Sequence, residues 1–203
     1  MQRRYITKHE WELVFQQLPD LPDFYRDRCM LFMTYIHGLR VSELTGLRMA
    51  DIDMNSQTIY ISRLKNGFST IHPLLDSEIK LLKQWISVRN KKQGNENNPW
   101  LFTSNKGGRI SRQWIYSLIR KYGELANLPI ILHPHTLRHA CGYSLANQGM
   151  DTRLIQDYLG HRNIRHTVHY TASNPKRFNR AWQNLSEPNI VFDNGSDFIF
   201  NNE

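Results

Sequence analysis

A change of hydrophobic period near residue 58 sets the narrowest limit on the fold of this chain. The residues on either side follow helical spacing, whereas the run Thr58-Ile59-Tyr60-Ile61-Ser62 is rich in β-formers. Asn66-Gly67 is a strong signal for a tight turn, and residues 69–72 can return as the partner strand. The chain therefore has to accommodate one small β-hairpin within a helical domain.

Start and stop signals divide the rest of the chain into short helices. Thr7 and Glu10 form a capping box, and Gly38 follows a helix as a left-handed cap would. Asp151 and Gly160 bracket a further helix in the same way. We predict a mainly α fold with a small antiparallel β-element and no internal repeat. The expected helices span about residues 7–18, 23–37, 42–47, 76–90, 111–126, 135–147, 151–159, 163–171 and 175–185.

Charge is unevenly distributed along the chain. The net charge is +8, but residues 187–203 carry only acidic charges, so the 26 Lys and Arg residues lie in residues 1–186 against 14 acidic ones. Such an excess indicates a polyanionic partner, and nucleic acid is the first candidate. We expect one domain over residues 1–186, followed by an acidic tail (187–203) that is flexible or docks on another subunit.

The sequence contains no apolar run of membrane-spanning length and no secretory signal at its N-terminus, so we expect a cytoplasmic protein without a membrane partner. Cys29 and Cys141 are far apart, each in an apolar segment with helical spacing. In a reducing compartment both are expected to be reduced core residues.

Six side chains form a set suited to phosphoryl transfer without a metal or cofactor, although each alone is more often a solvated charge or a packing residue. Two guanidiniums can hold the oxygens of a phosphodiester and oppose the charge of the transition state. A tyrosine, with a pKa of about 10, needs a base and positive charge nearby, and histidine can be that base. A lysine can protonate the leaving oxygen. The six are Arg40, Lys65, His135, Arg138, His161 and Tyr170.

Three motifs resemble those of the tyrosine recombinase (integrase) family. They are Gly38-Leu39-Arg40-Val41-Ser42-Glu43-Leu44, His135-Thr136-Leu137-Arg138-His139, and Leu159-Gly160-His161 with the downstream His169-Tyr170-Thr171. The resemblance covers roughly residues 5–180. It implies the catalytic-domain fold of that family and a site-specific enzyme that cleaves and rejoins double-stranded DNA.

The resemblance also implies a role for each residue of the set. Tyr170 would be the nucleophile that forms a 3′-phosphotyrosine intermediate, while Arg40 and Arg138 bind the scissile phosphate. Lys65 would be the general acid, and His135 the base or a phosphate donor. His161 would donate a hydrogen bond in the transition state, and Glu43 would support Arg40.

Residues 151–174 and 63–74 are similar to the short bacterial fimbrial phase-switch recombinases within this family. That subgroup inverts a promoter-bearing segment between inverted repeats, which implies phase variation of fimbrial genes and a place at the nucleoid. Most family members carry a separate N-terminal DNA-binding domain. The residues before Arg40 leave no room for one, so DNA-bending accessory proteins are expected partners.

An apolar stripe with helical spacing, Phe178, Trp182 and Leu185, marks the last expected helix. It either packs on the core of its own subunit or docks into a neighbour in a homotetramer on DNA, as the resemblance implies.

Three other functions are compatible with parts of the pattern. A type IB topoisomerase uses similar chemistry without site preference, and a DNA-binding regulator would bind without cleaving. A zinc protein would use His133, His135 and His139, but no Cys, Asp or Glu is placed to complete a four-ligand site.

Overall fold

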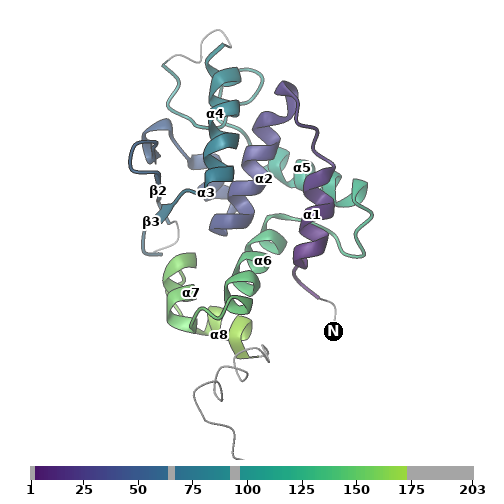
Figure 1. The fold of residues 1–203 in the computed structure, drawn as a ribbon, viewed down its shortest axis with the longest axis vertical. Helices are drawn as coiled ribbons and strands as arrows, with labels where there is room; N and C mark the ends of the chain where they lie inside the picture. The colour runs from purple at the N-terminus through teal and green to yellow at the C-terminus, as the bar shows by residue number, and fades with distance from the viewer. Residues whose placement is uncertain (1–2, 64–66, 92–96, 173–203) are drawn as a thin grey trace, which may run out of the picture.

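The computed structural model describes residues 3–63, 67–91 and 97–172. Within these ranges the fold is mainly helical with one small sheet, as predicted (Figure 1). The helices are α1 (Lys8–Gln16), α2 (Tyr25–His37), α3 (Val41–Gly46), α4 (Asp76–Lys91), α5 (Arg112–Leu125), α6 (Pro134–Asn147), α7 (Thr152–Leu159) and α8 (Arg165–Ala172), with 3-10 turns at Pro22–Phe24 and Met49–Asp51.

The predicted capping signals form where the sequence places them. The Thr7 hydroxyl accepts a hydrogen bond from the Glu10 amide (3.2 Å), and the Glu10 carboxylate accepts one from the Thr7 amide (2.7 Å). Gly38 and Gly160 end α2 and α7 in the left-handed region, at φ 57° and 63°. Because only glycine adopts this conformation without strain, both helices end at these residues.

The sheet contains three antiparallel strands in the order β1 (Ile52–Asp53), β2 (Thr58–Ile61) and β3 (Thr70–Pro73). Ile59 of β2 pairs with Ile52 on one side and with His72 on the other. The sequence predicts β2 and β3. It does not predict β1, since two residues are too short to show a period. The turn predicted at Asn66-Gly67 lies largely outside the described residues.

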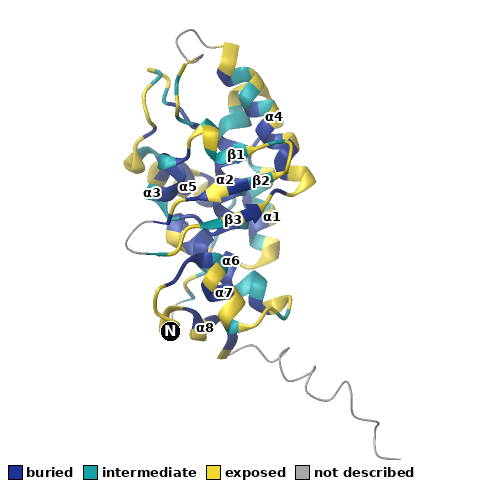
Figure 2. Cartoon of the chain, turned by 90° about the vertical axis from the view of Figure 1, so that its left-hand side faces the viewer, coloured by how far each residue is buried: buried dark blue, intermediate teal, exposed yellow. Residues whose placement is uncertain are grey.

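Two groups of buried side chains hold the molecule together, and Figure 2 shows the buried residues running through its interior. The larger group surrounds α2, which contacts both α4 and α6. The smaller group joins α6, α7 and α8 at the lower end of Figure 1. Cys141 and Tyr170 belong to it. Cys29 and Cys141 are free and buried, as predicted.

No helix among the described residues is both long enough and apolar enough to cross a membrane.

Candidate active site

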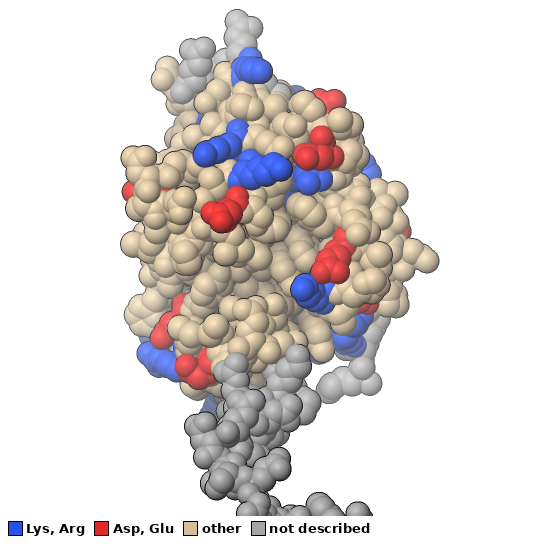
Figure 3. Space-filling view, in the orientation of Figure 1, with Lys and Arg blue, Asp and Glu red and all other residues tan. Residues whose placement is uncertain are grey.

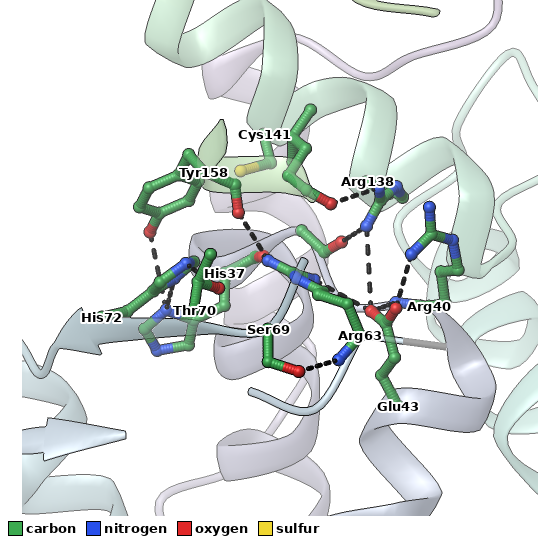
Figure 4. Close-up of polar contacts among 12 residues, drawn as sticks. His37, Arg40, Glu43, Arg63, Ser69, Thr70, His72, Arg138, Cys141 and Tyr158 are labelled. Carbon is green, nitrogen blue, oxygen red and sulfur yellow. Dashed lines mark hydrogen bonds and ion pairs between the residues drawn. The ribbon is translucent and has the colours of Figure 1, made fainter. Parts of the chain in front are cut away.

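The carboxylate of Glu43 lies at the centre of the candidate site, where it faces three arginines from three parts of the chain (Figure 4). Its oxygens lie 2.5 Å from Arg40 Nη1, 2.9 Å from Arg63 Nη1 and 3.8 Å from Arg138 Nη1. Glu43 also accepts a hydrogen bond from the Arg40 amide at the start of α3 (2.9 Å). Glu43 therefore fixes the guanidinium positions, and the expected support of Arg40 extends to all three arginines.

Burial alone would raise the pKa of the Glu43 carboxyl, because the residue is only 4% exposed. Arg63, the Arg40 amide and Arg138 outweigh burial and hold the pKa of this carboxyl below its ordinary value. Glu43 is therefore ionised at neutral pH and offsets part of the positive charge of the cluster.

Arg63 is a member of the site that our sequence analysis missed. It follows β2 and is 5% exposed, and it donates to the backbone oxygens of Tyr158 (2.6 Å) and His37 (3.3 Å) as well as to Glu43. A signal was present, because Ile59, Ile61 and Arg63 alternate along one side of the strand and all three are buried. Arg63 therefore ties the sheet to α2, α3 and α7.

Arg138 is almost fully buried on α6, and its position is fixed by backbone oxygens. It donates to Gly38 O (2.5 Å) and to Leu159 O (2.6 Å), so it joins the ends of α2 and α7. Burial, together with Arg40 and Arg63, lowers the pKa of Arg138 to about 9, which leaves it protonated at neutral pH. A guanidinium has five N–H donors, so the two carbonyl bonds leave capacity for an anion.

An open cavity of about 780 Å³ lies beside Arg40 and α7. Gln156, His161 and two further arginines, Arg153 and Arg162, contribute to its walls. His161 follows the Gly160 cap, and its Nδ1 lies 2.9 Å from the Thr167 hydroxyl. Burial and then Arg138 and Arg40 lower the pKa of His161 to about 3, so this imidazole is neutral. The cavity is therefore basic and of suitable character for an anionic ligand.

Tyr170 lies on α8 at 1% exposure, and it is not among the residues that line this cavity. Its ring stacks on that of His161 with 6.4 Å between centroids, and its hydroxyl lies 2.9 Å from His139 Nδ1. Burial raises the pKa of Tyr170, and Arg138 acts in the opposite direction. The hydroxyl is therefore protonated, and it has to approach the cavity before it can reach a phosphate there.

The structure brings four of the six predicted residues together, namely Arg40, Arg138, His161 and Tyr170. His135 is exposed on the first turn of α6, and its ring makes an edge contact with His133 at 6.2 Å. Lys65 lies outside the described residues. Among the described residues, no group of three or more His, Cys, Asp or Glu is arranged to hold a metal ion.

The fold and the site together define a class of protein: a helical domain in which an arginine and a histidine line an anion-accepting cavity, with a second arginine and a buried tyrosine packed behind them. The chain belongs to the phage integrase family, whose model matches residues 4–177.

Two relatives are similar to this chain along most of their length. It is 50% identical over 180 residues to the type 1 fimbriae regulatory protein FimB of Escherichia coli K12, covering 89% of this chain and 90% of FimB. It is 49% identical over 181 residues to FimE of the same strain, covering 89% and 91%. The match to tyrosine recombinase XerC of Actinobacillus pleuropneumoniae is 34% over 150 residues, or 74% of this chain and 48% of XerC.

Among solved structures, XerA recombinase matches with a TM-score of 0.75 and 26% identity, over 88% of this chain and 63% of the XerA chain. XerH bound to its difH substrate after cleavage matches with a TM-score of 0.73 and 22% identity, over 87% and 52%. The second match supports the fold alone. The chain is thus a tyrosine site-specific recombinase with the mainly α catalytic-domain fold that the sequence predicts.

Proposed function

We propose that this recombinase inverts a promoter-bearing DNA segment between inverted repeats and thereby switches fimbrial genes on and off in the bacterial cytoplasm, at the nucleoid. The similarity to two fimbriae regulatory proteins over about nine tenths of the chain supports the target. The observation that carries the chemistry is that Arg40 and His161 line one basic cavity while Arg138 and Tyr170 are packed behind them.

In this proposal the cavity receives the scissile phosphate. Arg40 is 22% exposed at the side chain and lines the cavity, while Arg138 is anchored behind it by backbone oxygens. Both would donate to the non-bridging oxygens and stabilise the charge that builds on them. His161 is held by Thr167 at the same wall and would donate a hydrogen bond in the transition state.

Tyr170 would then attack phosphorus, form a 3′-phosphotyrosine bond and release the 5′ oxygen. Lys65 is the proposed acid for that oxygen, and His135 the proposed base or phosphate donor. Because the ester conserves the energy of the broken bond, the strands can be rejoined without ATP. No metal or cofactor enters the proposed mechanism.

The charge distribution supports a phosphate contact at the cavity. The face in Figure 3 carries Lys and Arg interspersed with Asp and Glu over a largely uncharged surface. The cavity gathers Arg40, Arg153 and Arg162. We therefore assign the phosphate contacts closest to the reaction to this cavity.

We further propose that residues 1–186 form the catalytic domain and that the enzyme acts as a homotetramer on DNA. Phe178, Trp182 and Leu185, which lie outside the described residues, are the proposed docking stripe. DNA-bending accessory proteins are proposed partners. Removal of residues 176–203 is expected to spare DNA binding and abolish strand exchange.

Covalent trapping tests the proposed function. The protein is incubated with fragmented host DNA and denatured in detergent, and the attached DNA is sequenced, with Tyr170→Phe as control. We expect attachment at one pair of inverted repeats, only through Tyr170. Arg40→Ala should reduce attachment by roughly a hundredfold to a thousandfold, as for loss of one preorganised donor.

The other outcomes each identify a different function. Attachment scattered over the genome would indicate a topoisomerase. Binding without attachment would indicate a DNA-binding regulator that does not cleave. Covalent DNA on the Tyr170→Phe protein would show that another residue is the nucleophile.

A further inference from the structure

The hydroxyl of Tyr170 contacts a histidine that the family motifs do not single out for chemistry. His139 Nδ1 lies 2.9 Å from this oxygen, within hydrogen-bonding distance. His139 follows Arg138 directly on α6. One helix therefore supplies both a proposed phosphate-binding arginine and the partner of the proposed nucleophile.

Both partners of this hydrogen bond are neutral in the free protein. Burial and then His169 lower the pKa of His139 to about 4, so the imidazole is neutral at pH 7. The Tyr170 hydroxyl is protonated because burial raises its pKa. In the tautomer that carries the imidazole proton on Nε2, the phenol donates to the lone pair on Nδ1. A lone pair already aimed at the hydroxyl is the first requirement of a general base.

His135, the base expected from the motif, has a different environment. It is exposed on the first turn of α6, whereas His139 is partly buried one turn further along and reaches the tyrosine oxygen. Geometry is the first criterion for a general base and pKa the second. On geometry His139 is the better acceptor.

The Tyr170 ring packs closely against α6 around this contact. A Cβ atom at Gly142 would lie 2.6 to 2.8 Å from three ring carbons, so only glycine permits the observed packing. The Tyr143 ring makes an edge contact at 5.1 Å, and the His169 ring lies at 3.9 Å. The hydrogen bond to His139 is therefore part of a defined seat for the tyrosine.

We propose that His139, rather than His135, accepts the proton of Tyr170 when it attacks DNA, an inference that rests on the proposed function above. As the phenol oxygen bonds to phosphorus, its O–H bond breaks and the proton moves to Nδ1 of His139. The bond from phosphorus to the 5′ oxygen breaks, and that oxygen leaves with the electron pair and takes a proton from the acid assigned to Lys65. Rejoining reverses each transfer, and His135 keeps the role of phosphate donor.

The low basicity of His139 in the free protein does not prevent this step. While the phenol oxygen becomes an ester oxygen, its proton becomes strongly acidic, so transfer occurs in the transition state. A bound phosphodiester also brings negative charge, which favours the imidazolium. In the free protein the depressed pKa keeps the lone pair available.

Several titratable groups face His139, and the test has to separate their contributions. On α6 these are His133, His135 and Arg138, on α8 His169 and Tyr170, and at the N-terminus Arg3 and Arg4, which line a depression together with His139 and His133.

His139→Asn is the decisive variant, because asparagine can accept the hydrogen bond near the Nδ1 position but cannot take up the proton. Cleavage would be measured from pH 6 to 9 on a nicked duplex that carries the DNA sequence recovered by covalent trapping. We expect a loss of about a hundredfold or more at pH 7, the contribution of a general base. The rate of the variant should keep rising with pH where the wild-type rate is level, with DNA binding unchanged.

Two matched controls make the test specific. His133→Asn changes a neighbouring histidine at the α6 cap and should leave both rate and pH profile unaltered. A duplex with sulfur in place of the 5′-bridging oxygen has a leaving group that needs no proton. This duplex should restore the cleavage rate of the Lys65→Ala protein but not that of the His139→Asn protein. The defect of His139→Asn would then lie in activation of the nucleophile and not in protonation of the leaving group.

The opposite results are equally distinct. The proposal would be overturned if the His139→Asn protein kept the wild-type rate and pH profile or cleaved faster than the wild type. It would also be overturned if the pH profile were lost in His135→Asn and not in His139→Asn. If His139→Asn melts much below the wild type, His139→Gln is measured in the same way. Failure of the wild-type protein to form covalent DNA would reject the proposed function itself, independently of residue 139.

Discussion

Glu43 shows how one buried charge can organise a site at the scale of a single residue. The residue is 4% exposed, and its carboxylate lies within 4 Å of three guanidiniums. Buried ion pairs contribute little net stability when complete, but removal of one partner leaves buried charge without compensation. Arg40 before α3, Arg63 after β2 and Arg138 on α6 would repel one another without this carboxylate.

Glu43→Gln is therefore expected to lower the free energy of unfolding by roughly 3–5 kcal/mol, because the remaining buried guanidiniums lose their counter-charge. Chemical denaturation at pH 7.5 measures this loss. Glu124→Gln is the matched control, since it breaks an exposed pair with Arg120 and should cost less than about 1 kcal/mol. Equal effects of the two substitutions would show that Glu43 does not hold the arginines.

Single residues differ in how far the sequence reveals them. Arg40, Arg138, His161 and Tyr170 were found because their spacing matches family motifs, and the structure brings them together. Arg63 has no such motif, although strand alternation points it inward. The contact of His139 with Tyr170 joins residues 31 positions apart and depends on the packing of α6 on α8, which no local pattern specifies.

At the scale of elements, prediction succeeded where local chemistry defines the ends. The capping box at Thr7 and the glycine caps at Gly38 and Gly160 act within a few residues, so they are legible in sequence. Strand β1 was missed because its two residues are too few to show a period. The way α7 and α8 fold back on α6 is a tertiary property, and it decides where Tyr170 lies.

The contact between α6 and α8 leads to a prediction about Gly142. Glycine to alanine within a helix normally stabilises it by about 1 kcal/mol. Here the new Cβ would lie 2.6 Å from a Tyr170 ring carbon, so the ring has to move. We expect Gly142→Ala to reduce covalent trapping by about a hundredfold, as for a misplacement of about 1 Å, while DNA binding is retained.

Gly108→Ala provides the control for this substitution, because the nearest atom to its added Cβ is Ser104 Oγ at 3.9 Å. The ratio of trapped to bound DNA is the quantity to compare between the two proteins. A ratio for Gly142→Ala that equals that of Gly108→Ala would mean that the seat of Tyr170 tolerates displacement.

At the scale of the whole molecule, buried neutral histidines link the site to the stability of the fold. His72 and His161 are 2% and 9% exposed, and His72 lies in a chain of contacts from Glu78 through His37 to Thr70. Burial and His37 lower the pKa of His72 to about 3, and burial and Arg138 do the same for His161. Both side chains stay neutral in the folded protein over a range where they are protonated in the unfolded chain.

Stability should therefore fall as the solution becomes acidic. In the unfolded chain histidine has a pKa of about 6.5, so below that pH the unfolded state binds protons that the folded state does not bind. The free energy of unfolding is at its full value above pH 6.5. It falls progressively down to about pH 3, where the folded protein also takes up the protons. At pH 5 each histidine should have lowered the free energy of unfolding by roughly 2 kcal/mol relative to pH 7.5.

Urea denaturation at the two pH values measures this difference in the free energy of unfolding. His72→Asn should reduce the difference, whereas His9→Asn, at an exposed position, should not. A His72→Asn protein with the full wild-type difference would place the acid sensitivity elsewhere in the fold.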